Sequence, residues 1–231
     1  HTGEISINSS NTEDMSRLRN LVGFVPQDDV MHGELTVKEN VLFNALLRVP
    51  RSFDKPVDDL VDAVLTALGL TKVQSSLVGS VEKRGISGGQ RKRVNIAMEL
   101  VAQPACLMLD EPTSGLDSST AHQVIAELRS LANTTNCTSL AVIHQPRWET
   151  LMLFDQLILL APGGHLVYAG STADTLAYFT NFGFNVPTNS NPADALMDVI
   201  AAADKRSNAL PEDALPQKDT RTTEGLVALW R

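Results

Sequence analysis

The second half of the chain alternates short apolar runs with longer segments in which apolar residues recur at helical spacing. Strand-like runs occupy residues 107–109, 138–143 and 156–161, and helical patterns at residues 118–132 and about 147–154 separate them. Parallel strands cannot be joined by a tight turn, and the connection between them is usually a helix. The alternation therefore predicts an α/β fold built on a parallel sheet.

The first half combines short strands with a helical insert. Residues 1–29 contain strand-like runs separated by turns. Residues 30–85 predict an inserted helical region, because Thr36 and Glu39 form a capping-box pattern at the start of one helix, and a second apolar stripe covers residues 57–68.

Two apolar runs near the C-terminal third flank a Pro-Gly-Gly turn. Residues 157–161 and 165–169 therefore predict an antiparallel hairpin at the edge of the sheet, followed by helices at about 172–182 and 192–202. Beyond Ala203 the composition becomes polar and proline-containing, which is typical of a linker.

Charge and cysteine content exclude several classes of protein. The formal net charge of −8 and pI of about 5.1 argue against a nucleic-acid partner. The two cysteines form no spaced framework, which favours reduced thiols over a disulfide-stapled secreted domain. Apolar runs stop well short of the roughly 18 residues that cross a bilayer. Because the sequence starts at His1 with no leader pattern, we expect it to be cut from a longer protein.

Two adjacent carboxylates, Asp110 and Glu111, follow a buried strand. Ligands of open α/β sheets bind at the carboxyl ends of the strands, where one carboxylate can hold a metal ion and the other can orient water. A solvated acidic turn explains these residues alone equally well.

A helix N-terminus supplies a second chemical feature. Ser87, Gly88, Gly89 and Gln90 open a helix that Pro104 ends, and the free N–H groups of such a terminus attract anions. An ordinary N-cap in a tight turn is the alternative for these residues alone.

In combination these stretches resemble the ATP-binding cassette (ABC) ATPases, an α/β P-loop family. Gln27 resembles the Q-loop glutamine and His144 the switch histidine. The segments that resemble the signature loop, Walker B and the D-loop are respectively Ile86-Ser87-Gly88-Gly89-Gln90, Leu107-Met108-Leu109-Asp110-Glu111 and Ser114-Gly115-Leu116-Asp117.

The resemblance implies ATP and Mg²⁺ as cofactors and a role for each matching residue. Glu111 would polarise the attacking water, His144 would bond the γ-phosphate region, and Asp110 and Gln27 would hold Mg²⁺. Residues 87–90 would close over ATP held by a second cassette, and Asp117 would cross the same interface. The resemblance thus implies a dimer, with no metal site that is stable without nucleotide.

Further motifs narrow the resemblance to the G subfamily of half-transporters, in which a membrane domain follows the cassette. It covers residues 1–203 and includes Val25-Pro26-Gln27-Asp28-Asp29, residues 84–93 and Asn191-Pro192-Ala193-Asp194. It implies ATP-driven export of a hydrophobic or lipid-like substrate, in a membrane protein whose cassette lies on the cytoplasmic face. We expect four parts: strands at 1–29, a helical subdomain at 30–103, a catalytic α/β subdomain at 104–203 and a linker at 204–231.

One family motif is missing from the sequence. No G-x-x-x-x-G-K-[ST] loop, which cradles the β- and γ-phosphates in P-loop enzymes, occurs in the 231 residues. We expect this loop upstream in the complete protein, and we expect the chain by itself to bind ATP poorly and to be inactive.

Two alternatives remain open from the sequence. One is a non-catalytic cassette that only offers its signature face in trans, and the other is a soluble ABC ATPase without membrane helices. The basic run Arg91-Lys92-Arg93 is interpreted as a solvated face or a set of interface pairs. The scattered histidines predict no metal site built by the protein alone.

Overall fold

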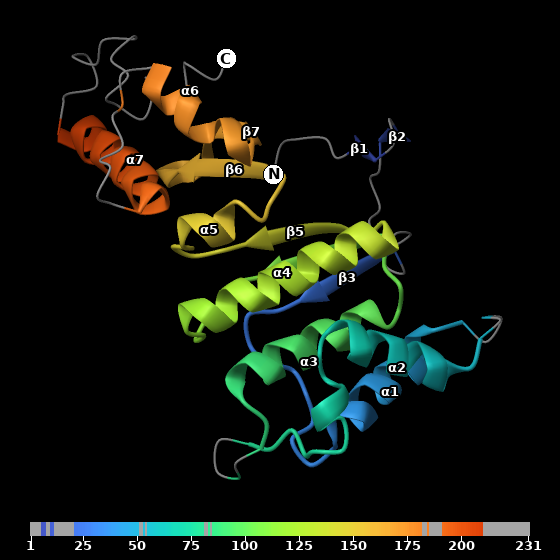
Figure 1. The fold of residues 1–231 in the computed structure, drawn as a ribbon. Coiled ribbons are helices and arrows are strands. Elements are labelled where there is room, and N and C mark those ends of the chain that lie inside the picture. Colours follow the sequence, from blue (N-terminus) through green and yellow to red (C-terminus); the bar gives the residue numbers. More distant parts are fainter. Residues whose placement is uncertain are drawn as a thin grey trace. The chain divides into compact units, whose positions relative to one another are not determined.

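The computed structural model describes residues 6–7, 10–11, 21–50, 53, 55–80, 83, 85–181, 184 and 191–209. The chain divides into two compact units, His1–His144 and Gln145–Arg231, and each is described by itself. Figure 1 shows the elements in chain order. They are β1 (Ser6–Ile7), β2 (Ser10–Asn11), β3 (Val22–Val25), α1 (Val37–Arg48), α2 (Val57–Ala67), η2 (Thr71–Val73), α3 (Gly88–Leu100), β4 (Cys106–Asp110), α4 (Ser118–Thr135), β5 (Thr138–Val142), α5 (Trp148–Leu151), β6 (Gln156–Ala161), η3 (Pro162–Gly164), β7 (His165–Ser171), η4 (Thr172–Asp174), α6 (Thr175–Asn181) and α7 (Pro192–Ala209).

A parallel sheet with the order β3-β4-β5 lies at the centre of the first unit. Both strand pairs are parallel, and their register places Val25 beside Leu109 and Asp110 beside Val142. The predicted parallel α/β architecture is therefore confirmed.

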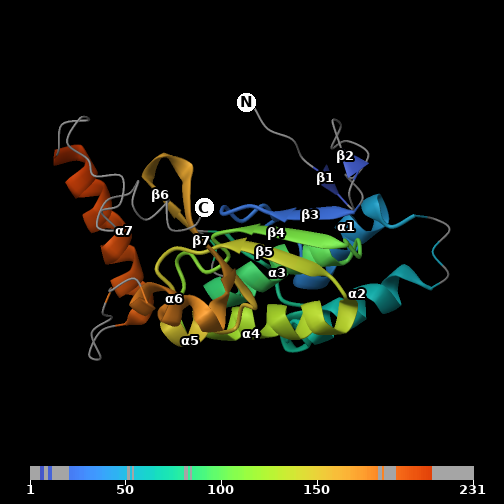
Figure 2. The ribbon, with the colours of Figure 1, turned by 90° about the horizontal axis from the view of Figure 1, so that it is seen from above.

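The two helices α3 and α4 lie on the same side of this sheet (Figure 2). On the strands, Val25, Leu107 and Leu109 are almost completely buried. Because side chains alternate between the two faces of a strand, these residues share one face, whereas Phe24 faces the other way and is 54% exposed.

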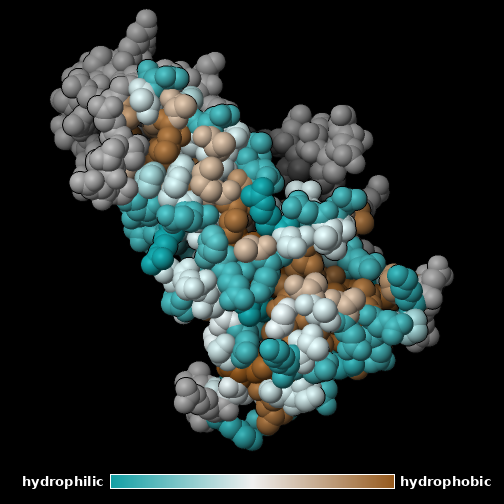
Figure 3. Space-filling model, viewed as in Figure 1, coloured by the Kyte–Doolittle hydropathy of each residue, from teal (hydrophilic) through white to brown (hydrophobic). Residues whose placement is uncertain are grey.

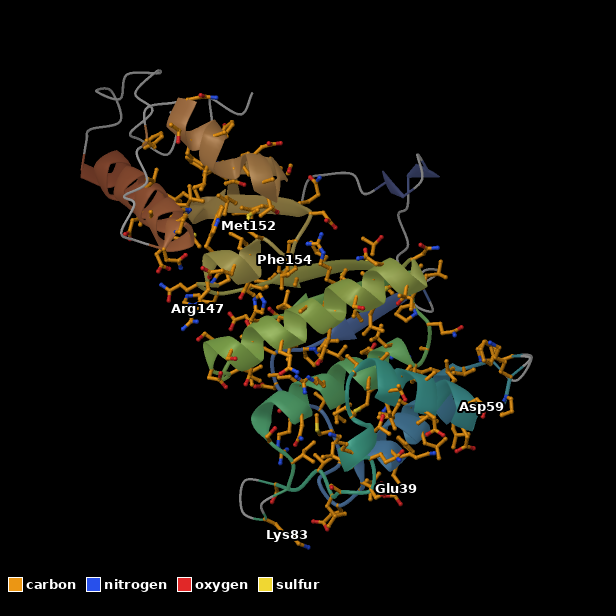
Figure 4. The ribbon with its side chains drawn as sticks, viewed as in Figure 1. Glu39, Asp59, Lys83, Arg147, Met152 and Phe154 are labelled. Carbon is orange, nitrogen blue, oxygen red and sulfur yellow. The ribbon has the colours of Figure 1, made fainter. Side chains whose placement is uncertain are left out.

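The helices α1, α2 and α3 pack together next to the sheet, and α1 and α2 lie within the range 30–85 that the sequence predicts to be helical. The expected capping box at α1 is present: the Oε2 of Glu39, labelled in Figure 4, accepts from the Thr36 N–H at 2.7 Å, and the Thr36 hydroxyl accepts from the Glu39 N–H at 3.2 Å. In Figure 3, exposed hydrophobic atoms lie among hydrophilic ones in the part of the surface formed by these helices. Leu46 and Leu47 of α1 are 65% and 69% exposed.

The second unit is built on the predicted antiparallel hairpin. Strands β6 and β7 pair with each other in a two-stranded sheet. The hairpin packs against α6 and α7 around the buried side chains of Val167, Phe179, Leu196 and Ile200. The hairpin is thus confirmed, and its place at the edge of the parallel sheet stays a prediction.

Several helix ends differ from expectation. The last residue of α4 is Thr135, three residues later than predicted. Asn136 caps the helix with a left-handed backbone conformation, at a φ of 53°. The helix α7 continues to Ala209, past Ala203. Of the strand-like runs predicted within residues 1–29, the structure describes β1, β2 and β3, and Arg84 and the linker beyond Ala209 lie outside the described residues.

The four-part division expected from the sequence stays a prediction. Within the described ranges, no helix is long and apolar enough to span a bilayer.

Candidate functional site

Polar residues follow the carboxyl ends of all three parallel strands. Gln27 lies two residues after β3, Glu111 directly follows β4, and His144 lies two residues after β5. Because the strands are parallel and in register, these positions lie at one edge of the sheet, the edge where α/β proteins bind ligands.

Gln27 and Glu111 meet directly at this edge. The Gln27 Nε2 donates to the Glu111 Oε2 at 3.0 Å, although the two residues are far apart in the sequence. The Glu111 N–H donates to the Val142 carbonyl at 3.0 Å, which continues the β4–β5 ladder by one residue and fixes the glutamate backbone. The structure therefore brings together Gln27 and Glu111, two residues that the sequence singles out separately.

Glu111 adopts an unusual backbone conformation. Its φ is +44°, in the left-handed region that non-glycine residues rarely occupy. Such conformations persist where the surrounding structure holds them, and they concentrate at functional sites. Here the hydrogen bonds to Val142 and Gln27 supply that support.

His144 is exposed, and Asn191 holds the loop that follows it. The Asn191 Oδ1 accepts from the Trp148 N–H at 3.1 Å, and the Asn191 Nδ2 donates to the Pro146 carbonyl at 3.3 Å. The Asn-Pro-Ala-Asp stretch, which the sequence offered only as a family mark, therefore ties the start of α7 to the segment beyond His144. Sequence reasoning missed this role because the partners are backbone groups.

The oxygen atoms available at the strand edge fit a magnesium ion. The Asp110 carboxylate ends β4, and the Gln27 amide keeps its oxygen for another ligand because its nitrogen faces Glu111. Carboxylate and amide oxygens are the donors that Mg²⁺ prefers, usually together with waters and substrate phosphates. Among the residues that the structure describes, no group of three or more His, Cys, Asp or Glu side chains gathers as a metal cluster.

The signature residues form the start of α3. Ser87 is the N-cap and makes a capping box with Gln90: the Ser87 N–H donates to Gln90 Oε1 at 2.9 Å, and the Gln90 N–H donates to Ser87 Oγ at 3.3 Å. Gly88 and Gly89 occupy the first turn, where N–H groups have no acceptor within the helix. The N-cap interpretation is therefore confirmed, and the anion site stays a prediction.

Gly89 is also fixed by its packing against α4. A Cβ at Gly89 would overlap the Thr120 methyl group, whereas a Cβ at Gly88 would lie 3.6 Å from Leu116 Cδ2, an ordinary contact. Of these two glycines, only Gly89 lies where the packing leaves no room for a side chain.

Asp117 caps α4 and holds Thr120 in place. Its Oδ1 accepts from the N–H groups of Ser119 and Thr120 at 3.0 Å each, and its Oδ2 accepts from the Thr120 hydroxyl at 2.6 Å. The hydrogen bonds from the Thr120 side chain and backbone lower the pKa of this carboxyl. Both oxygens of the candidate D-loop aspartate are therefore engaged within its own chain.

Of the two interpretations of the basic run, the solvated face is wrong for Lys92 and Arg93, and the set of interface pairs stays a prediction. Lys92 and Arg93 are only 8% and 9% exposed. Arg93 Nε lies 2.7 Å from Glu127 Oε2 on α4, and Lys92 Nζ lies 3.1 Å from Asp29 Oδ1. The physical reason is that α3 is buried on most sides, so charged residues in it need internal partners.

Two parts of the chain match known protein families. Residues 1–114 match the family described as ABC transporter, and residues 144–219 match the family described as ABC-2 type transporter.

Several curated proteins are similar over nearly the whole chain. "ABC transporter G family member 28" from Arabidopsis thaliana is 46% identical over 90% of this chain and 19% of its own length. "ABC transporter G family member 25" from Oryza sativa subsp. japonica is 43% identical over 86% of the chain and 20% of its own length. "Broad substrate specificity ATP-binding cassette transporter ABCG2" from Sus scrofa is 42% identical over 90% of the chain and 33% of its own length. The chain thus spans between a fifth and a third of the length of these relatives.

Proposed function

Because this chain belongs to the ABC transporter family, with relatives in its G family, we propose that it is part of an ATP-hydrolysing cassette that powers a dimeric half-transporter. The observation that carries the proposal is the 3.0 Å hydrogen bond between Gln27 and Glu111 at the carboxyl edge of the parallel sheet. This bond joins the side chains of Gln27 and Glu111, which in this proposal both contact the attacking water.

Glu111 acts as the general base of hydrolysis. Its carboxylate accepts a hydrogen bond from the Gln27 amide, which orients one oxygen and leaves the other to accept from a water molecule. A carboxylate held in this way aligns and polarises water for attack on a phosphoryl group. His144, at the end of the neighbouring strand, bonds the γ-phosphate region.

Asp110 and Gln27 would hold the magnesium ion that accompanies ATP, because both side chains carry oxygen atoms of the kind that Mg²⁺ prefers. Bound Mg²⁺ neutralises negative charge that develops on the phosphate oxygens.

The signature residues Ser87, Gly88, Gly89 and Gln90 act in trans. The first turn of α3 offers N–H donors and the positive end of a helix dipole, which suit the γ-phosphate of ATP held by a second cassette. Asp117 lies in the same contact region through Thr120 and Gly89, and contributes to the interface between cassettes.

The cassette lies on the cytoplasmic face of a membrane, next to the protein's own membrane domain, and drives export of a hydrophobic or lipid-like substrate. The match of residues 144–219 to the ABC-2 type transporter family supports the membrane domain and speaks against a soluble ABC ATPase. The name of the Sus scrofa relative, which describes broad substrate specificity, is compatible with such a substrate.

The test is phosphate release by the purified full-length protein at saturating ATP. The proposal predicts steady hydrolysis with Mg²⁺ and none after chelation by EDTA. A folded, dimeric full-length protein that binds ATP but releases no phosphate would instead support the non-catalytic alternative, a cassette that only offers its signature face.

A further inference from the structure

One face of α3 carries two charged side chains that both reach the strand β3 and its continuation. Glu99 lies near the end of the helix and Lys92 about two turns earlier, so they project from the same side. Neither residue belongs to the set that the sequence singled out as functional.

Glu99 fixes the strand itself. Its Oε2 accepts from the backbone N–H of Phe24 at 3.1 Å and from Arg48 Nη1 of α1 at 2.6 Å. The ion pair with Arg48 orients this partly buried carboxylate. The C-terminal half of α3 is thereby attached to both β3 and α1.

Lys92 fixes the segment that follows the strand. Its Nζ donates to the backbone carbonyl of Gln27 at 2.6 Å and pairs with Asp29 Oδ1 at 3.1 Å, while its side chain is only 10% exposed. A buried ammonium group has to be paired, so these contacts determine where the lysine lies. They equally determine where the backbone of Gln27 lies.

The two attachments match in length. The rise of α3 from Lys92 to Glu99 is about 10 Å, two turns of helix. The chain from Phe24 to Gln27 can span up to about the same distance, 10 Å. Because Glu99 meets Phe24 and Lys92 meets Gln27, α3 runs antiparallel to this segment and holds it at both ends.

We propose that Lys92 is a positioning residue for hydrolysis: it holds the Gln27 backbone so that the Gln27 amide reaches Glu111. The carbonyl of Gln27 bonds Lys92 and its side chain bonds Glu111, so one residue joins the signature helix to the base. This role rests on the proposed hydrolytic function. It also couples the position of α3, whose first turn carries the signature residues, to the geometry at Glu111.

The test is a double-mutant cycle on hydrolysis by the full-length protein. Lys92→Met keeps the side-chain length but removes the donor, and we expect kcat to fall about tenfold, as loss of a charged hydrogen bond implies. The KM for ATP should change less than about twofold, because Lys92 touches no nucleotide. In a Gln27→Ala background the same substitution should cause no further loss. Lys92→Arg, which keeps charge and donors, should retain most of the activity.

Lys38→Met is the matched control, since Lys38 also pairs with an aspartate, Asp62, at 2.7 Å, and its ion-pair partners Asp58 and Asp62 both lie in α2, away from Gln27. It should leave kcat unchanged. The proposal is overturned if Lys92→Met leaves kcat unchanged, or if it lowers kcat equally in the Gln27→Ala background, which is the result of a merely structural role.

A second readout separates this inference from the proposed function. Hydrogen exchange of the Gln27, Asp28 and Asp29 amides should become faster in Lys92→Met and stay unchanged in Lys38→Met. That result would support the positioning role even if the wild-type protein hydrolysed no ATP, and unchanged exchange would reject it.

Discussion

The methyl group of Thr120 lies where a side chain on Gly89 would have to go. Thr120 cannot easily turn away, because its hydroxyl donates to Asp117 at 2.6 Å. The start of the signature helix and the start of α4 are thus fitted to each other through a glycine, a threonine and an aspartate. Part of the signature motif therefore serves the fold of its own chain.

This contact predicts different stabilities for the two signature glycines. Gly89→Ala should destabilise the start of α3 by about 1–3 kcal/mol, the cost of overpacking. Gly88→Ala should change stability by less than about 1 kcal/mol, because the new methyl meets only Leu116. Hydrogen exchange of the α3 amides in the full-length protein measures both, and equal effects would contradict the packing argument.

The Asp117 cap predicts a pH dependence. The pKa of this carboxyl is lowered in the folded protein, so its contribution to stability is complete above the pKa of an unfolded aspartate, about 3.9. The contribution is lost as the pH falls through the lower, folded pKa. Asp117→Asn keeps an N-cap oxygen but does not titrate.

The apparent unfolding midpoint of wild type should therefore fall towards that of Asp117→Asn on acidification. A difference between the two proteins that stays constant down to about pH 3 would show that the carboxylate adds nothing through its charge.

The ion pair between Arg93 and Glu127 predicts a strongly destabilising single substitution. Burial raises the pKa of Glu127, and Arg93, whose Nε lies 2.7 Å from Glu127 Oε2, opposes this effect. Arg93→Met removes the ion-pair partner of this partly buried carboxylate and should destabilise the first unit by about 3 kcal/mol at neutral pH. Arg93→Met combined with Glu127→Leu should recover much of the loss. Additive losses in the double variant, measured by hydrogen exchange of α3 and α4, would show that the two residues do not interact.

Signature residues that act in trans predict a specific pattern in mixed dimers. When one subunit carries Ser87→Arg and the other Glu111→Gln, one of the two ATP sites keeps both residues intact, and about half the wild-type hydrolysis should remain if the sites act independently. When one subunit carries both substitutions and the other none, each site is damaged and hydrolysis should be lost. The reverse pattern would mean that Ser87 acts on the ATP of its own subunit.

Local signals were sufficient for much of the fold. The alternation of strand and helix patterns predicted the parallel sheet, and the spacing of Thr36 and Glu39 predicted the capping box that starts α1. The Pro-Gly-Gly turn predicted the β6–β7 hairpin. These features depend on short-range periodicity and capping, which a single sequence displays directly.

Features that depend on tertiary burial could not be predicted in this way. The run Arg91-Lys92-Arg93 has the composition of a solvated surface, and only the packing of α3 against β3 and α4 shows that Lys92 and Arg93 are internal. The partners of Lys92 include a backbone carbonyl, which leaves no trace in side-chain patterns. A long buried helix that still contains basic residues is the one signal that could have directed attention to them.

The candidate site could be predicted from the sequence only in part. Motif order alone indicated Gln27, Glu111 and His144, and the strand register explains why they follow one edge of the sheet. The bond between Gln27 and Glu111 joins two distant parts of the chain, so only the structure shows it.

The most direct test of hydrolysis at this edge is to measure ATP affinity and ATP turnover in the same full-length Glu111→Gln preparation. Glu149→Gln, which alters an exposed glutamate of α5, is the control. We predict that Glu111→Gln binds Mg·ATP about as tightly as wild type while its turnover falls at least about 100-fold, because a general base is lost and binding groups are kept. Turnover near the wild-type rate would contradict the assignment of Glu111 and, with it, the proposed site.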